Sequence, residues 1–239
     1  MAVAEHTTKA FDNDLQELGR LIAEMGGLAE RQIVEVIEAL TKRDLERAGR
    51  VVKADAAIDT LQRNIEERVV VTIARRQPMA NDLREVVGVL RISNELERIG
   101  DLAKNIGKRV IALHGGEISR RSLRGVRHMA SLALVQLRDA LDSFARRDLV
   151  QAGTVRVRDE EVDRMDSSMF QELLTYMFED PGTIAASIHL VFCTKNLERM
   201  GDHATNIADA VQYIVEGSAL PVELAPASDA HLHPLAMGA

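Results

Sequence analysis

Apolar residues along this chain recur at alternating intervals of three and four positions, the spacing of one face of an α-helix. The clearest examples run from Val89 to Val110 and from Leu190 to Val211. Such segments predict long amphipathic helices that pack into bundles. Turn-forming positions divide the chain into six predicted helices of roughly 30 residues, each about 45 Å long. These positions are Thr41–Arg43, Gln77–Pro78, Gly115–Gly116, Arg146–Arg147 and Asp180–Pro181.

The sequence contains an internal duplication. The segment ELERIGDLAKNI, Glu95–Ile106, agrees with NLERMGDHATNI, Asn196–Ile207, at eight of twelve positions. A second segment, RDLERAGRVVKADAAID at Arg43–Asp59, aligns without gaps with RDLVQAGTVRVRDEEVD at Arg147–Asp163, and eight of these seventeen positions are identical. We therefore predict an all-α protein made of two tandem three-helix bundles.

The duplication also sets the predicted domain boundaries. The first repeat covers residues 10–114 and the second covers residues 118–216. Residues 217–239 are rich in Ala and Pro and lack helical periodicity, so they are predicted to form a flexible tail. Because aromatic residues make up only 3% of the chain and Trp is absent, aliphatic side chains must fill both cores. Long helices suit such a composition.

Composition and charge argue against several classes of protein. The formal net charge of −7 argues against nonspecific nucleic-acid binding, which needs a basic surface. The sequence has no run of about 18 apolar residues that would span a membrane. Its N-terminal segment also lacks the apolar stretch of a secretory signal. The single cysteine, Cys193, forms no internal disulfide and suits a reducing compartment. We therefore expect a cytoplasmic protein.

Each repeat carries two acidic pairs at i, i+4 spacing, which places both carboxylates on one helical face, where they repel. Asp59 lies about 18 residues before the turn at Gln77–Pro78 and Glu97 about 19 after it, so antiparallel packing brings the pairs to one height. Four such groups repel strongly unless they are protonated, paired or bridged by a cation. Hard or borderline metals prefer these oxygen ligands. The predicted metal ligands are Asp55, Asp59, Glu97, Asp101, Asp159, Asp163, Glu198 and Asp202.

Residues beside these acids leave two interpretations open. Arg98 and Arg199 would neutralise the acids without a metal. Gly100 and Gly201 each cost about 1 kcal/mol in the middle of a helix, which suggests close approach by another helix or a ligand. His203 directly follows Asp202 and is a weaker candidate for contact with a bound ion.

At this level of detail the sequence resembles the PhoU family of bacterial phosphate-signalling regulators. The resemblance covers about Phe11–Tyr213 and rests on the duplicated repeat, on RRQPMANDLREV from Arg75, and on the ERIGD and ERMGD motifs. It implies a metal cluster on each repeat, held by E(D)xxxD motifs at the eight positions above. The implied metals are iron, zinc or nickel, and the sequence does not choose among them. Glu160 and Glu161 adjoin Asp159 and are alternative ligands.

The same resemblance implies a regulatory role and no enzymatic activity. PhoU proteins act as negative regulators when phosphate is plentiful, and they link the ATPase subunit of the phosphate-specific ABC transporter to a membrane sensor histidine kinase. We therefore expect a cytoplasmic adaptor, often a homodimer, that reaches the membrane only through its partners. The connection to phosphate comes from the resemblance alone.

Two alternatives differ from this interpretation in their chemistry. A ferritin-type di-metal oxidase would carry Glu-x-x-His motifs, and the sequence contains none. A helical scaffold that regulates another transporter without bound metal would show the same periodicity, with its acids facing water.

Overall fold

The computed structural model describes residues 2–113 and 118–217, with side chains from residue 10 onward. These two ranges contain helices and turns but no strand, so the all-α prediction is confirmed. The elements are α1 (Ala2–Lys42), α2 (Leu45–Arg76), α3 (Asn81–Ala112), α4 (Arg120–Arg146), α5 (Leu149–Glu179), the 3-10 turn η1 (Pro181–Thr183) and α6 (Ile184–Glu216).

Four of the five predicted helix breaks coincide with helix ends. The duplicated Arg-Asp-Leu sequence forms the turn after the first helix of each half. Arg43 and Arg147 adopt a positive φ of 56°, and the Asp44 and Asp148 side chains accept hydrogen bonds from backbone N–H groups of the next helix. The fifth break, Gly115–Gly116, lies outside the described residues.

Two other predictions about the ends of the chain have different outcomes. The predicted helix length of roughly 30 residues is wrong for α1, which begins at Ala2 and has 41 residues. The predicted tail, apart from Gly217, lies outside the described residues. Among the described helices, none combines the length and apolarity that crossing a membrane requires.

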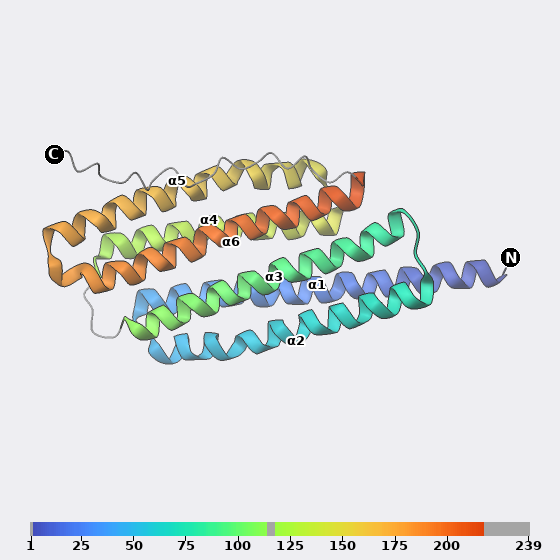
Figure 1. The fold of residues 1–239 in the computed structure, drawn as a ribbon, viewed down its shortest axis with the longest axis horizontal. Coiled ribbons are helices and arrows are strands. Elements are labelled where there is room, and N and C mark those ends of the chain that lie inside the picture. Colours follow the sequence, from blue (N-terminus) through green and yellow to red (C-terminus); the bar gives the residue numbers. More distant parts are fainter. Residues whose placement is uncertain (1, 114–117, 218–239) are drawn as a thin grey trace, which may run out of the picture.

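The two halves lie side by side along their long axes, each as an antiparallel three-helix bundle (Figure 1). The most extensive packing between any two helices joins α3 to α6, and α1 also packs against α4. Buried side chains from all six helices therefore form one continuous apolar core. The repeats share this core, although the duplication alone suggested two separate bundles.

The antiparallel pairing of α3 and α6 places the two acidic motifs near each other. The Arg91 guanidinium lies 4.2 Å from the Tyr213 ring centre at one end of the pair. Near the other end, the Arg109 guanidinium lies 4.1 Å from the Phe192 ring centre. The ERIGD motif of α3 and the ERMGD motif of α6 therefore meet at the middle of this pair.

Candidate metal centre

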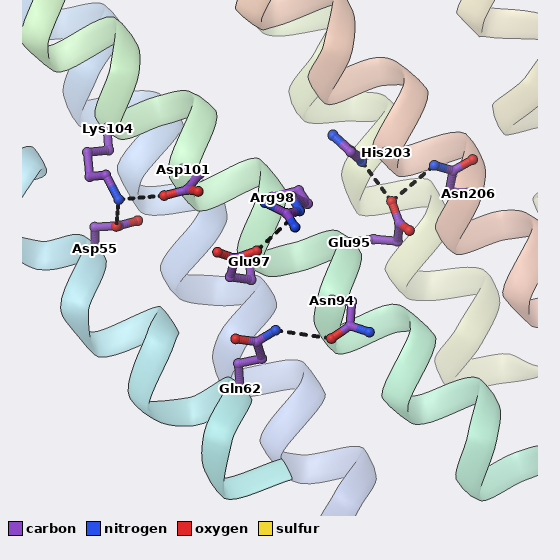
Figure 2. A network of polar contacts seen from close by, with 10 residues as sticks. All are labelled: Asp55, Gln62, Asn94, Glu95, Glu97, Arg98, Asp101, Lys104, His203 and Asn206. Atoms are coloured by element: carbon purple, nitrogen blue, oxygen red, sulfur yellow. Dashed lines mark hydrogen bonds and ion pairs between the residues drawn. The ribbon is translucent and has the colours of Figure 1, made fainter. Parts of the chain in front are cut away.

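The first cluster consists of Asp55 and Asp59 on α2 with Glu97 and Asp101 on α3. Asp55 is buried, with 3% of its surface exposed. The Lys104 ammonium lies 2.5 Å from Asp55 Oδ2 and 2.5 Å from Asp101 Oδ1 (Figure 2). A cationic side chain from α3 thus joins two of the four predicted ligands.

The electrostatics of the first cluster follow from burial and from this lysine. Burial raises the pKa of the Asp55 carboxyl, although its hydrogen bond with Lys104 acts in the opposite direction. Burial likewise raises the pKa of Glu97, and the charge of Asp101 adds to that shift. Hydrogen bonds to Asp101 and Asp55 raise the pKa of Lys104. Lys104 is therefore a permanent positive charge inside the cluster at neutral pH.

The second cluster consists of Asp159 and Asp163 on α5 with Glu198 and Asp202 on α6. Asp163, Glu198 and Asp202 each place one carboxylate oxygen within 4.8 Å of the others, and no other trio of His, Cys or acidic side chains in the described part of the chain does so. The Lys195 ammonium lies 2.5 Å from Glu198 Oε1. The other oxygen, Glu198 Oε2, is buried without a hydrogen-bond partner among the described residues.

Asp159 lies apart from this trio and bonds to a buried amide. The fully buried Gln136 side chain on α4 donates from Nε2 to Asp159 Oδ1 at 2.8 Å and to Thr205 Oγ1 at 3.2 Å. A Cβ atom at Gly201 would lie 2.9 Å from Gln136 Oε1 and 3.0 Å from Asp159 Oδ1. The glycine of the ERMGD motif therefore permits this close approach of three helices.

In the second cluster, repulsion between like charges adds to the effect of burial and raises the carboxyl pKa values further. Burial is the largest cause for Asp163 and Glu198, and the charge of Asp202 raises the pKa of both carboxyls. Burial and the Asp202 charge also raise the pKa of Asp159, against the effect of its bond from Gln136. A bound cation would relieve this repulsion.

Between the two clusters, a polar contact crosses from α3 to α6. Glu95 Oε2 lies 2.7 Å from His203 Nδ1 and accepts a hydrogen bond of 3.0 Å from Asn206 Nδ2 (Figure 2). Burial alone would favour the protonated acid, but these hydrogen bonds outweigh it and lower the pKa of Glu95. His203, a weak candidate ligand from the sequence, thus contacts the other repeat.

Comparison with known proteins agrees with this duplicated geometry. A family model described as the PhoU domain matches residues 22–110 and again residues 126–211. The chain belongs to the PhoU family. The two matches, one in each half, confirm the predicted tandem repeat.

The relatives cover most of the chain. A protein of Rhizobium meliloti named phosphate-specific transport system accessory protein PhoU homolog is 51% identical over 89% of this chain and 90% of its own length. A Caulobacter vibrioides protein of the same name is 46% identical over 91% of this chain and 95% of its own.

Solved structures of PhoU proteins have the same fold. The crystal structure of PhoU from Pseudomonas aeruginosa superposes with a TM-score of 0.82 at 39% identity, covering 87% of this chain and 100% of that one. The phosphate transport system regulatory protein PhoU from Streptococcus pneumoniae gives a TM-score of 0.82 at 26% identity, covering 89% of this chain and 100% of that one.

The second cluster fits the metal that the PhoU resemblance implies. Three carboxylates offer hard oxygen donors at close range, and one of their oxygens, Glu198 Oε2, is buried without a partner among the described residues. Asp163 and Asp202 are exposed, which leaves room for water ligands beside a cation. Metal binding at the eight predicted acids stays a prediction.

The cations that accompany the acids agree only in part with those the sequence suggested. Arg98 forms a long ion pair of 3.6 Å with Glu97, as expected, whereas Arg199 forms no ion pair within the described ranges. Lys104 and Lys195 make the shorter contacts with the acids. A signal was available in the sequence, since each lysine lies three residues from an acid of its motif, a spacing that brings two side chains together on a helix.

Proposed function

We propose that this chain is an accessory protein of a phosphate-specific transport system that restrains phosphate uptake and starvation signalling when phosphate is plentiful. The observation that carries the proposal is the match of both repeats to PhoU, together with relatives named for this accessory role at 51% and 46% identity. In this proposal the protein acts in the cytoplasm by docking to its partners and catalyses no reaction.

The proposed partners are the ATPase subunit of the transporter and a phosphate-sensing histidine kinase, with the protein acting as a homodimer that reaches the membrane through them. An exposed apolar stripe on α6 supports docking to another protein. Ile184, Ile188 and Phe192 follow each other at i, i+4 spacing and are each 40–46% exposed. Arg109 from α3 lies over the Phe192 ring and adds a positive charge to this surface.

The proposal also includes metal ions on the paired acids, with iron, zinc or nickel as candidates. The close approach of Asp163, Glu198 and Asp202 supports this part, because mutual repulsion among the three carboxylates favours a cation between them. When bound, the ion would supply a charge that fixes the surface between α5 and α6. Asp163, Glu198 and Asp202 would hold it.

Deletion of the gene from its host tests the regulatory role. In phosphate-rich medium, we expect the deletion strain to take up phosphate faster than its parent and to express a phosphate-starvation reporter. The intact gene should reverse both effects. The double substitution Ile188→Asp with Phe192→Asp should fail to do so, because charge disrupts an apolar docking surface. Val157→Asp, at an exposed site on α5, is the matched control and should complement. Unchanged uptake and reporter expression in the deletion strain would contradict the proposal.

A further inference from the structure

The two acidic clusters differ at one aligned position. Three residues after Asp101 the first repeat has Lys104, and three residues after Asp202 the second repeat has Thr205. Lys104 extends to Asp55 on the neighbouring helix, whereas Thr205 Oγ1 accepts a hydrogen bond from Gln136. The same backbone position thus supplies a cation in one repeat and a neutral hydroxyl in the other.

The position of the Lys104 ammonium opposes metal binding at the first cluster. Its Nζ atom lies 2.5 Å from one oxygen of Asp55 and 2.5 Å from one oxygen of Asp101. Those two oxygens already share their lone pairs with the ammonium, and a second cation beside Nζ would be repelled by it. A metal that used these two oxygens would have to displace Lys104 from Asp55, which is 3% exposed and has no other ion pair among the described residues.

The second cluster has no such obstacle. Its lysine, Lys195, contacts only Glu198 Oε1, and the Lys195 side chain is 56% exposed, so it can turn to water. Asp163 and Asp202 form no ion pair within the described ranges, so no ammonium lies between two acids there as Lys104 does in the first cluster. Buried oxygens without a hydrogen-bond partner among the described residues occur in both clusters, Asp55 Oδ1 in the first and Glu198 Oε2 in the second, so Lys104 is what distinguishes them.

We propose that the two clusters are chemically inequivalent: Lys104 is a built-in cation that closes the first cluster to metal, and the second cluster binds the metal. The inference departs from the family resemblance, which implies a metal on each repeat. It rests on the proposed function only in assuming that the acids of this chain bind metal.

Exchange of the two aligned residues tests the proposal, with Zn²⁺ as the probe. Full-length protein is stripped with chelator and titrated by calorimetry, and its zinc content is measured after desalting. The parent should bind zinc in one class of site, which Asp202→Asn removes and Asp101→Asn leaves in place. Lys104→Thr should add a second class and increase the zinc content about twofold, because it gives the first cluster the chemistry of the second. Thr205→Lys should abolish binding.

Two further variants serve as controls. Lys104→Met keeps most of the lysine stem and should gain the same extra zinc. Agreement between the two variants would show that the gain comes from loss of the ammonium and not from altered packing. Lys108→Thr changes an exposed lysine one turn further along α3 and should leave the zinc content unchanged. Circular dichroism verifies that each variant is folded.

Each remaining outcome overturns the inference, and the outcomes are distinguishable. If the parent binds zinc at both clusters, so that Asp101→Asn halves the content, inequivalence is wrong while the proposed metal binding stands. If the parent and both Lys104 variants all bind no zinc, inequivalence and the metal part of the proposed function are wrong together. The uptake experiment then tests the regulatory role independently.

Discussion

In the first cluster Lys104 lies between two acids, whereas in the second cluster the aligned Thr205 binds a buried amide and three carboxylates face one another. The backbone plan is otherwise shared, since both repeats place acids at i, i+4 spacing beside a mid-helix glycine. The cations differ at two aligned positions, Lys104 against Thr205 and Asn94 against Lys195, and these differences change how the charge is balanced. Symmetry of sequence therefore does not establish equivalence of chemistry.

The polar contact between the repeats also lacks a symmetry-related counterpart. Glu95 of α3 binds His203 and Asn206 of α6. The aligned residues in the opposite repeat are Asn196 for Glu95 and Leu102 for His203, so the symmetry-related contact lacks both the acid and the imidazole. Among the described residues, this contact of an acid with an imidazole between α3 and α6 thus exists once, close to the centre of the molecule.

The largest expected effect distinguishes two acids at aligned positions, Asp55, which is buried, and Asp159, which is partly buried. In metal-free protein, Asp55→Asn should lower the free energy of unfolding by about 1–2 kcal/mol, because Lys104 loses its buried partner while the cost of burying the Asp55 charge offsets part of that loss. Asp159→Asn should leave stability unchanged or raise it by about 0.5 kcal/mol, because Asp159 has no cationic partner among the described residues and asparagine still accepts from Gln136.

Urea unfolding in the presence of chelator measures both variants. The double variant Asp55→Asn with Lys104→Met is the control, and it should recover part of the loss because the ammonium that lost its buried partner is gone. Equal destabilisation by Asp55→Asn and Asp159→Asn would show that the two clusters balance their charge alike.

Periodicity predicted the helices and most of their ends because apolar spacing and turn residues are local properties. It also predicted that the acids on neighbouring helices lie at one height, since the rise per residue is constant. The joining of α3 to α6 was not predictable in this way, because an apolar face does not specify which helix covers it.

The chemistry of the clusters was predicted less completely than their position. Lys104 was missed because a lysine on a helix surface extends to water as readily as to an acid, and its choice depends on Asp55 from another helix. Gln136 was missed because α4 carries no acidic motif, and only packing brings its amide to Asp159. The contacts that these residues make across helices leave no periodic signal.

An intermediate effect is expected at the contact of Glu95 with His203 and Asn206 between the repeats. Glu95→Gln should lower the free energy of unfolding by about 1 kcal/mol near neutral pH, because a carboxylate accepts stronger hydrogen bonds than an amide. The pKa of Glu95 is lowered in the folded protein, so its contribution is present above the ordinary carboxyl pKa and is lost as pH falls through the lowered value. The difference between parent and variant should therefore shrink in acid.

Thermal unfolding between pH 3 and pH 7 follows that difference. Asn196→Ala is the matched control, because Asn196 occupies the aligned position in the other repeat and has no comparable partner among the described residues. We expect it to change stability by less than about 0.5 kcal/mol. A loss that does not shrink as pH falls would assign Glu95 a packing role instead.

The smallest expected effect has opposite signs in the two clusters. In metal-free protein near neutral pH, Asp101→Asn should destabilise by about 0.5 kcal/mol because Lys104 loses one partner. Asp202→Asn should stabilise by a similar amount, because the Asp202 charge raises the pKa of Asp163 and of Glu198. Because the pKa values of Asp163 and Glu198 are raised in the folded protein, these groups contribute stability below the ordinary carboxyl pKa, and this stability is lost as pH rises. Without the Asp202 charge the two pKa values are raised less, so Asp202→Asn should lose less stability as pH rises.

Paired urea titrations at pH 4 and pH 7 measure these signs. The gain from Asp202→Asn should be larger at pH 7 than at pH 4, because protonation weakens the repulsion as pH falls. Zinc at saturating concentration should reverse the sign for Asp202→Asn, because the parent then gains binding energy that the variant lacks. The same zinc should leave the effect of Asp101→Asn unchanged. If both substitutions had the same sign at pH 7, Lys104 would not be what separates the two repeats.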